Sequence, residues 1–142
     1  MAAGHGSRSS QQIMAIVGTG IDIIEVERIA RALGNPITGE RFRRRVFTAG
    51  ERAYCEGRGR ARYQSYAARF AAKEAAMKAL GTGWNRHAGW QEIEVARERG
   101  RPPLIRLHGK AAEFAAGRGI ARLQVSLTHT ATMAIAHVIA EG

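Results

Sequence analysis

The feature that most constrains the fold is an alanine-rich, proline-free stretch from Ser65 to Leu80. Alanine has the highest helix propensity of all residues, whereas a proline in a helix interior would cost about 3 kcal/mol. Gly81-Thr82-Gly83 follows at once, and a glycine directly after a helix is a common C-terminal stop. The sequence therefore predicts one long helix over residues 65–80, against which the rest of the chain packs.

Segments on both sides of this helix predict strands, because they are short and apolar or alternate between apolar and polar residues. These segments are Ala15–Ile24, Glu92–Arg97, Leu104–Leu107, Ala121–Leu127 and Met133–Ala140. Gly100-Arg101-Pro102-Pro103 separates two of them and predicts a hairpin. Shorter helices are predicted over residues 25–33, 40–47 and 110–116. Thr48 and Glu51 have capping-box spacing, so another helix should begin there. We expect an α+β fold with an antiparallel sheet and one long helix.

Length and composition predict a single domain. A chain of 142 residues with 45% hydrophobic residues can form one core. Residues 1–12 are small and polar and lack the apolar segment of a signal peptide, so we expect a flexible tail followed by one domain over 13–142. No apolar run approaches the length of a membrane span. Cys55 is the only cysteine, which excludes an intrachain disulfide and favours a cytoplasmic setting.

The chain is strongly basic, with 22 Lys and Arg against 12 Asp and Glu, a formal net charge of +10. Such a balance indicates anionic partners. Nucleic acid, an anionic membrane surface, a polyphosphate ligand and an acidic protein all satisfy it, so charge alone leaves these classes open.

Asp22 is the one carboxylate inside the apolar first strand. A charge there is costly unless a positive group compensates it. From the strand alone, an ion pair with a lysine or arginine is favoured over a metal site, because structural ion pairs also perturb carboxylates. The neighbouring Gly18-Thr19-Gly20 is no dinucleotide fingerprint, since Ile23 stands where a third glycine is required.

The long helix carries a second group of charged residues. Glu74 and Lys78 are four residues apart, as are Arg69 and Lys73. At that spacing a glutamate and a lysine stabilise a helix by about 0.2–0.5 kcal/mol, which is an ordinary structural role. The flanking alanines, however, leave room for a ligand, and the Gly81–Gly83 segment could expose backbone N–H groups to a phosphate.

His129 lies in a third polar group, Ser126-Leu-Thr-His-Thr, at the end of a predicted strand. A single histidine is by default structural, and the other histidines show no zinc-ligand spacing with it. Two carboxylates are too few for an all-protein metal cage, but they suit magnesium, which takes its other ligands from water and substrate phosphates. With the nearby cations, the three groups predict a phosphoryl-transfer site.

Three segments resemble the signatures of bacterial holo-acyl-carrier-protein synthases, within the 4′-phosphopantetheinyl transferase superfamily. They are residues 20–29 (GIDIIEVERI), 69–83 (RFAAKEAAMKALGTG) and 125–129 (VSLTH). Residues 47–51 (FTAGE) are similar too. Three motifs in order are specific, and the resemblance as a whole extends over roughly Ala15 to the end of the chain.

The resemblance implies the phosphopantetheinyl transferase fold, a homotrimer with active sites between subunits, and transfer of 4′-phosphopantetheine from coenzyme A to a serine of apo-acyl carrier protein. The products are holo-acyl carrier protein, used in fatty acid biosynthesis, and 3′,5′-ADP. It implies magnesium held by Asp22 and Glu74, with Lys78 on the pyrophosphate. The residues it implies at coenzyme A are Arg69, Lys73, Lys78, Gly81, Thr82, Gly83 and His129. Those it implies at the carrier are Arg28, Arg41, Phe42 and Arg45. The general base stays open between Glu74 and a metal-bound water.

The alternative from another class is a small nucleic-acid-binding domain, supported by the net charge and by the basic run Arg41–Arg45. Aromatic residues make up only 6% of the chain and form no stacking strand. We therefore expect neither nucleic acid nor a membrane as the partner.

Overall fold

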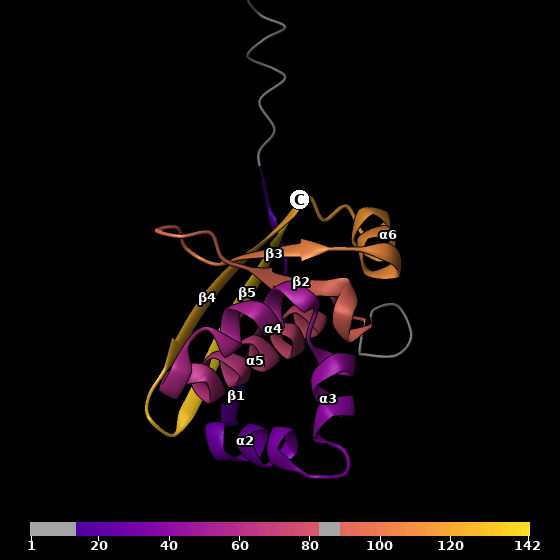
Figure 1. Cartoon of the computed structure of the whole chain (residues 1–142). Coiled ribbons are helices and arrows are strands. Elements are labelled where there is room, and N and C mark those ends of the chain that lie inside the picture. Colours follow the sequence, from indigo (N-terminus) through magenta and orange to yellow (C-terminus); the bar gives the residue numbers. More distant parts are fainter. Residues whose placement is uncertain (1–13, 83–88) are drawn as a thin grey trace, which may run out of the picture.

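The long helix α5 (Arg62–Leu80) lies against a three-stranded antiparallel sheet in the computed structural model, which describes residues 14–82 and 89–142 (Figure 1). The strands of this sheet are β1 (Ile16–Glu25), β4 (Arg122–His129) and β5 (Met133–Glu141). Their order is β1-β5-β4, so the C-terminal strand lies in the centre and pairs with both others. The predicted α+β class, antiparallel sheet and dominant helix are confirmed.

Two glycines of β1 allow the strand to touch the backbone of α5. A Cβ atom at Gly18 would overlap the carbonyl oxygen of Ala79, and one at Gly20 would overlap that of Ala75. Glycine in a strand interior commonly marks such a close approach. This contact fixes the next residues of β1, including Asp22, against the C-terminal half of α5.

The sheet has one covered and one open face. On β5, the alternate residues Ala134, Ala136, Val138 and Ala140 are buried beneath the helix. On β1, the alternation leaves Ile21 61% exposed and Ile23 57% exposed on the opposite face. An apolar side chain with this exposure loses the stabilisation that burial gives, so the open face has the character of an interface.

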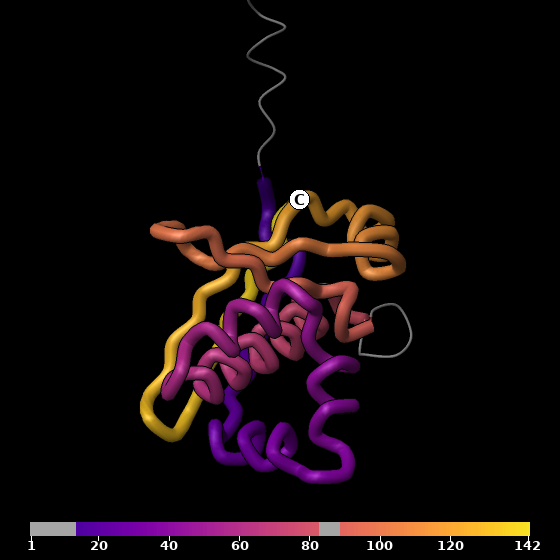
Figure 2. The backbone as a smooth tube through the Cα atoms, viewed as in Figure 1, coloured from indigo at the N-terminus to yellow at the C-terminus, as the bar shows by residue number. Residues whose placement is uncertain are grey.

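The remaining elements form a second group around α5 (Figures 1 and 2). The hairpin of β2 (Ile93–Ala96) and β3 (Leu104–Leu107) pairs antiparallel. The helices are α2 (Val26–Gly34), α3 (Gly39–Val46), α4 (Ala49–Glu56) and α6 (Gly109–Gly117), and the two short 3₁₀ turns are η2 (Gly59–Ala61) and η3 (Trp90–Glu92).

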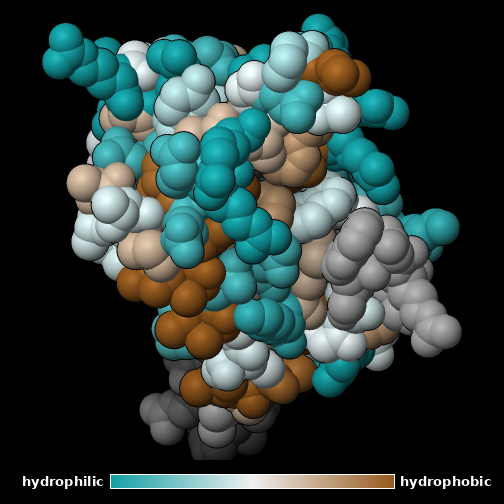
Figure 3. All heavy atoms as spheres, turned by 90° about the horizontal axis from the view of Figure 1, so that it is seen from below, coloured by the Kyte–Doolittle hydropathy of each residue, from teal (hydrophilic) through white to brown (hydrophobic). Residues whose placement is uncertain are grey.

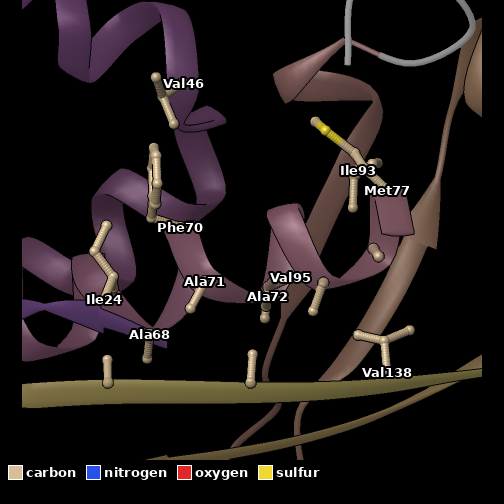
Figure 4. Close-up of a cluster of buried hydrophobic side chains, with 14 of the residues drawn as sticks. Ile24, Val46, Ala68, Phe70, Ala71, Ala72, Met77, Ile93, Val95 and Val138 are labelled. Atoms are coloured by element: carbon tan, nitrogen blue, oxygen red, sulfur yellow. The ribbon is translucent and has the colours of Figure 1, made fainter. Parts of the chain in front are cut away.

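The core lies between α5 and both sheets. Figure 4 shows the small side chains of Ala71 and Ala72 on α5 and larger ones around them, such as Phe70, Val95 and Val138. Because alanines bring the helix axis close to the strands, the buried face of α5 has little room for cavities.

The main difference from the sequence prediction is the start of the long helix. It begins at Arg62 instead of Ser65, directly after η2. Arg62 stacks its guanidinium 4.6 Å from the ring centroid of Tyr63, which helps to order this turn. The predicted hairpin and the capping box of Thr48 and Glu51 are confirmed.

No helix in the described part of the chain is long and apolar enough to cross a membrane. The predicted tail over 1–12 lies outside the described residues.

Candidate active site

Asp22 and Lys78 form the centre of the candidate site. Lys78 Nζ lies 3.2 Å from Asp22 Oδ1 and donates a hydrogen bond of 2.9 Å to the carbonyl oxygen of Ile21. The Asp22 side chain is 18% exposed and that of Lys78 is 54% exposed. The strand carboxylate therefore has the cationic partner that its burial requires. Because Lys78 remains half exposed, it is also accessible to a ligand.

Glu74 lies close to this pair, one helical turn before Lys78. Burial raises its pKa above the ordinary glutamate value, and the nearby Asp22 carboxylate raises it further. The charges of Lys78 and Arg28 act in the opposite direction. Two carboxylates that repel one another in a half-buried position favour a cation between them.

The donor chemistry of Asp22 and Glu74 fits magnesium. Both offer hard carboxylate oxygens, which this ion prefers. In residues 14–82 and 89–142, no three His, Cys, Asp or Glu side chains gather into a metal-binding group. The two carboxylates would thus hold an ion that takes its other ligands from water and substrate oxygens, as magnesium commonly does.

Arg69 and His129 line a separate pocket of about 270 Å³. Its lining residues are Tyr54, Arg58, Ser65, Ala68, Arg69, Arg97, Leu127, Thr128 and His129. Three arginines and a histidine on one concave surface give it a positive potential, which suits a phosphate group. Arg58 and Arg97 lie outside every motif identified in the sequence, so the sequence did not predict their place in this pocket.

Arg69 is buried, and its guanidinium packs against the aromatic ring of Tyr54. Its guanidinium carbon lies 4.1 Å from the centroid of Tyr54. Its Nη1 donates to the carbonyl of Ser65, but its Nε has no hydrogen-bond partner in the described structure. A buried N–H without a partner is costly, so Arg69 has a donor that no described group of the protein uses.

The two groups of residues lie on different sides of α5. Arg69 and Glu74 are five residues apart, which rotates their side chains by about 140° around the helix axis. In the sheet, Asp22 lies on β1 and His129 on β4, with β5 between them. The structure thus brings Asp22, Glu74 and Lys78 together, and separately Arg69 and His129.

Lys73 does not reach either group. Its ammonium is fully buried and lies 2.8 Å from Glu51 Oε1. It also donates to the backbone carbonyls of Trp90 and Ile93 at 2.8 and 2.6 Å. Burial lowers the pKa of Lys73, and the charge of Glu51 opposes this effect. With its hydrogen bonds directed into the core, Lys73 serves the fold, and the expected contact with coenzyme A is not available in this arrangement.

The turn after α5 also differs from the expectation. Gly81 has φ +79, the left-handed conformation, and its N–H donates to the carbonyl of Met77. The N–H of Thr82 donates to the same carbonyl at 3.2 Å. These two N–H groups close the helix, so they are not free for a phosphate. Thr82 Oγ1 is buried without a partner in the described chain. Gly83 lies outside the described residues.

The four residues expected at the carrier protein lie on α2 and α3. Arg28, Arg41 and Arg45 are exposed and Phe42 is half buried. Arg41, Phe42 and Arg45 line a shallow pocket of about 280 Å³ between the two helices. Figure 3, which views the molecule from below Figure 1, shows apolar side chains interrupted by hydrophilic ones on that face. Such a mixture is typical of a protein-binding surface.

The chain is similar to several known proteins. Residues 18–134 match the family model described as the 4′-phosphopantetheinyl transferase superfamily. The holo-[acyl-carrier-protein] synthase of Solibacter usitatus is 48% identical over 127 residues, covering 89% of this chain and 99% of that protein.

Two solved structures are similar as well. The holo-[acyl-carrier-protein] synthase of Neisseria meningitidis has a TM-score of 0.80 and 30% identity, over 90% of this chain and all (100%) of the other. The synthase of Bacillus anthracis, solved in complex with CoA (3′,5′-ADP), has a TM-score of 0.73 and 33% identity, over 92% and 99% of the two chains.

Proposed function

This chain belongs to the 4′-phosphopantetheinyl transferase superfamily, and from that premise we propose that it acts as a holo-acyl-carrier-protein synthase. It transfers the 4′-phosphopantetheine group of coenzyme A to a serine of apo-acyl carrier protein. The products are holo-acyl carrier protein, which serves fatty acid biosynthesis, and 3′,5′-ADP. The observation that carries the proposal is the cluster of Asp22, Glu74 and Lys78, which joins β1 to α5 within the span matched by the family model.

Asp22 and Glu74 are the residues that would hold magnesium. When bound, the ion supplies positive charge to the pyrophosphate oxygens. Lys78 adds a second cation, and its ammonium can turn from Asp22 toward a phosphate because it is half exposed. The cluster thereby stabilises the negative charge that develops on the phosphoryl group and on the leaving 3′,5′-ADP.

The proton of the acceptor serine needs an acceptor near the phosphate. Glu74 lies in the cluster with Asp22 and Lys78, and a carboxylate oxygen of Glu74 that does not hold the ion could take this proton. We therefore favour Glu74 for this role, although it also contributes to the metal site.

The pocket of Arg69 and His129 is proposed for the nucleotide end of coenzyme A. Its arginines and the unused Nε donor of Arg69 suit the 3′-phosphate. Gly81, Thr82 and Gly83 are proposed to line the same ligand.

The separation of the two groups supports a site shared between subunits. One subunit contributes Asp22, Glu74 and Lys78, and its neighbour contributes Arg69 and His129. The exposed Ile21 and Ile23 on the open sheet face supply apolar area for such an assembly. We propose a homotrimer, the smallest ring beyond a dimer in which each subunit uses both surfaces.

The arginines on α2 and α3 are proposed to bind the carrier protein. Arg28, Arg41 and Arg45 are exposed cations, and Phe42 beside them offers an apolar contact. An acidic carrier would be attracted to this surface, which also explains part of the net charge of +10. The buried lone Cys55 agrees with a cytoplasmic setting.

Mass spectrometry of apo-acyl carrier protein, incubated with coenzyme A, magnesium and this protein, tests the proposal. We expect a mass increase of one phosphopantetheine group, and its loss in the Asp22→Asn variant and after chelation of the metal. Carrier that stays unmodified with the wild-type protein would reject the proposed function.

A further inference from the structure

The C-terminal end of α5 poses an electrostatic problem for a phosphate ligand. A helix C-terminus carries a partial negative charge of about half an elementary charge, which repels anions. The N–H groups of Gly81 and Thr82 are not available to bind the ligand and so compensate this repulsion, because both donate to the carbonyl of Met77. If coenzyme A lies along this turn, another group must make it suitable for phosphate.

Arg118 lies where its positive charge can compensate the negative end of α5. It directly follows α6, and its Nη1 donates a hydrogen bond of 3.1 Å to the carbonyl oxygen of Leu80, the last residue of α5. The guanidinium also touches the turn, since a Cβ atom at Gly81 would lie 2.6 Å from Nη1.

The charge of Arg118 has no acidic partner in the described part of the chain. Its guanidinium carbon also lies 5.8 Å from the centroid of the Phe114 ring. An arginine has five N–H donors, and the bond to Leu80 uses one of them. The side chain is exposed, so the other donors remain accessible to a ligand.

Thr82 supplies an independent indication of a ligand at this turn. It is only 9% exposed, yet its Oγ1 has no hydrogen-bond partner among the described residues. A buried hydroxyl without a partner is unfavourable, and a bound polar molecule would satisfy it. Thr82 is the next residue after Gly81, and Gly81 is the residue that Arg118 contacts.

The helix that presents Arg118 is itself held firmly. The Glu92 carboxylate accepts hydrogen bonds from the N–H of Ala111 in the first turn of α6 and from the N–H of Gly89. The Glu92 carbonyl accepts a further bond of 2.8 Å from the N–H of His108. Figure 1 shows α6 directly after the end of β3. The position of Arg118 is therefore fixed by the fold, which lowers the cost of ordering it around a ligand.

We propose that Arg118 is a further binding residue of the coenzyme A site, which neutralises the C-terminal end of α5 and donates to a phosphate of the ligand beside Thr82. The inference rests on the proposed function and adds a residue that none of the three signature segments contains. Since the contribution comes from charge, it predicts that a neutral donor at this position does not suffice.

The test compares Arg118→Gln, which keeps an N–H donor without charge, with Arg118→Lys, which keeps the charge. We expect Arg118→Gln to raise the KM for coenzyme A and the Kd for 3′,5′-ADP about ten-fold, the lower end for a bond to a charged group. The kcat at saturating coenzyme A should stay close to the wild-type value. Arg118→Lys should recover most of the affinity.

The control is Arg122→Gln, which removes an arginine of β4 that pairs with Glu141 of β5 and should change neither constant. If Arg118 only caps α5, Arg118→Gln will retain the wild-type KM and Kd, and the inference is rejected. Calorimetric binding of coenzyme A tests Arg118 separately from transfer, so a wild-type protein that binds but does not transfer would reject the proposed function alone.

Discussion

Glu74 combines its proposed role at the site with a cost to the stability of the fold. Its pKa is raised by burial and by Asp22, so folding favours its protonated form. A carboxyl group whose pKa is higher in the folded state stabilises the fold fully below its unfolded value, and this contribution is lost as the pH rises through the folded value. At neutral pH the ionised Glu74 side chain therefore lowers the stability of the folded state.

We expect Glu74→Gln to abolish transfer while raising the melting temperature by a few degrees at about pH 7 in the absence of metal. The difference from wild type should become small at about pH 3, below the ordinary glutamate pKa, where the carboxyl group is mostly protonated in both states. Thermal unfolding at the two pH values measures it, with the exposed Glu113→Gln as the matched control. A variant that melts below the wild type at both pH values would contradict this account.

Lys73 shows why a residue role was not predictable from spacing. The sequence places it four residues from Arg69, which suggests a helix-surface pair. Its actual partner is Glu51 on α4, and only the folded chain brings the two together. The same glutamate accepts from the N–H of Val95 at 2.7 Å, so one carboxylate joins three elements. The motif resemblance implies a contact with coenzyme A for both Lys73 and Lys78. In the structure, Lys73 is buried and Lys78 is exposed, so only Lys78 is accessible to a ligand.

Removing this lysine should damage the fold. Lys73→Met leaves the Glu51 carboxylate buried without its partner, which costs about 3–5 kcal/mol of the free energy of unfolding. The double variant Lys73→Met with Glu51→Gln should lose less, because the uncompensated charge is gone. Urea denaturation of the two single variants and the double variant gives the coupling energy. Equal losses that simply add would show that the pair is not coupled.

At the scale of elements, most helices and strands could be predicted, because each has its own pattern. Alternation marks β2 and β3, and alanine content marks α5. The strand order β1-β5-β4 could not be predicted, because β1 and β5 are far apart in sequence and their pairing depends on packing against α5. The start of α5 at Arg62 was missed since residues 58–62 lack an apolar pattern.

The contact between β1 and α5 should tolerate no side chain at its centre. In a Gly20→Ala variant, the new methyl group would overlap the backbone oxygen of Ala75, and no rotamer can relieve a clash of a Cβ atom with backbone. We expect a loss of about 1–3 kcal/mol or more in the free energy of unfolding, together with lower activity because Asp22 moves away from Glu74. Denaturant unfolding measures the loss.

Gly57→Ala is the control for this substitution, since a Cβ atom there lies at 3.4 Å or more from its neighbours. Its stability should differ little from that of the wild type. A Gly20→Ala protein with wild-type stability would show that β1 does not rest on α5 in this way.

At the scale of the whole molecule, charge governs the encounter with the carrier. Arg28→Glu or Arg45→Glu should raise the KM for acyl carrier protein at least ten-fold, since it replaces attraction by repulsion. The calorimetric Kd for coenzyme A should barely change. Added salt should weaken the wild type more than the variants, because it screens the attraction that they have lost. Lost coenzyme A binding with an unchanged carrier KM would instead place these arginines at the phosphates.

The proposed assembly has a consequence that only mixed subunits reveal. Asp22 lies with Glu74 and Lys78, whereas Arg69 lies with His129 on another side of α5. If each site takes its two groups from neighbouring subunits, Asp22→Asn and Arg69→Ala damage the contributions of two different subunits to a site. Both variants alone should be inactive, because every site in either trimer then lacks one group.

Trimers reassembled from equal amounts of the two variants should regain activity. A site is intact when an Arg69→Ala subunit supplies Asp22 and its Asp22→Asn neighbour supplies Arg69, which random assortment produces in about one quarter of the sites. Sedimentation confirms that the mixture is trimeric. Ile23→Glu on the open sheet face, introduced into both variants, should prevent assembly and with it the recovery. A trimeric mixture that stays inactive, or a fully active wild-type monomer, would show that each site is built within one chain.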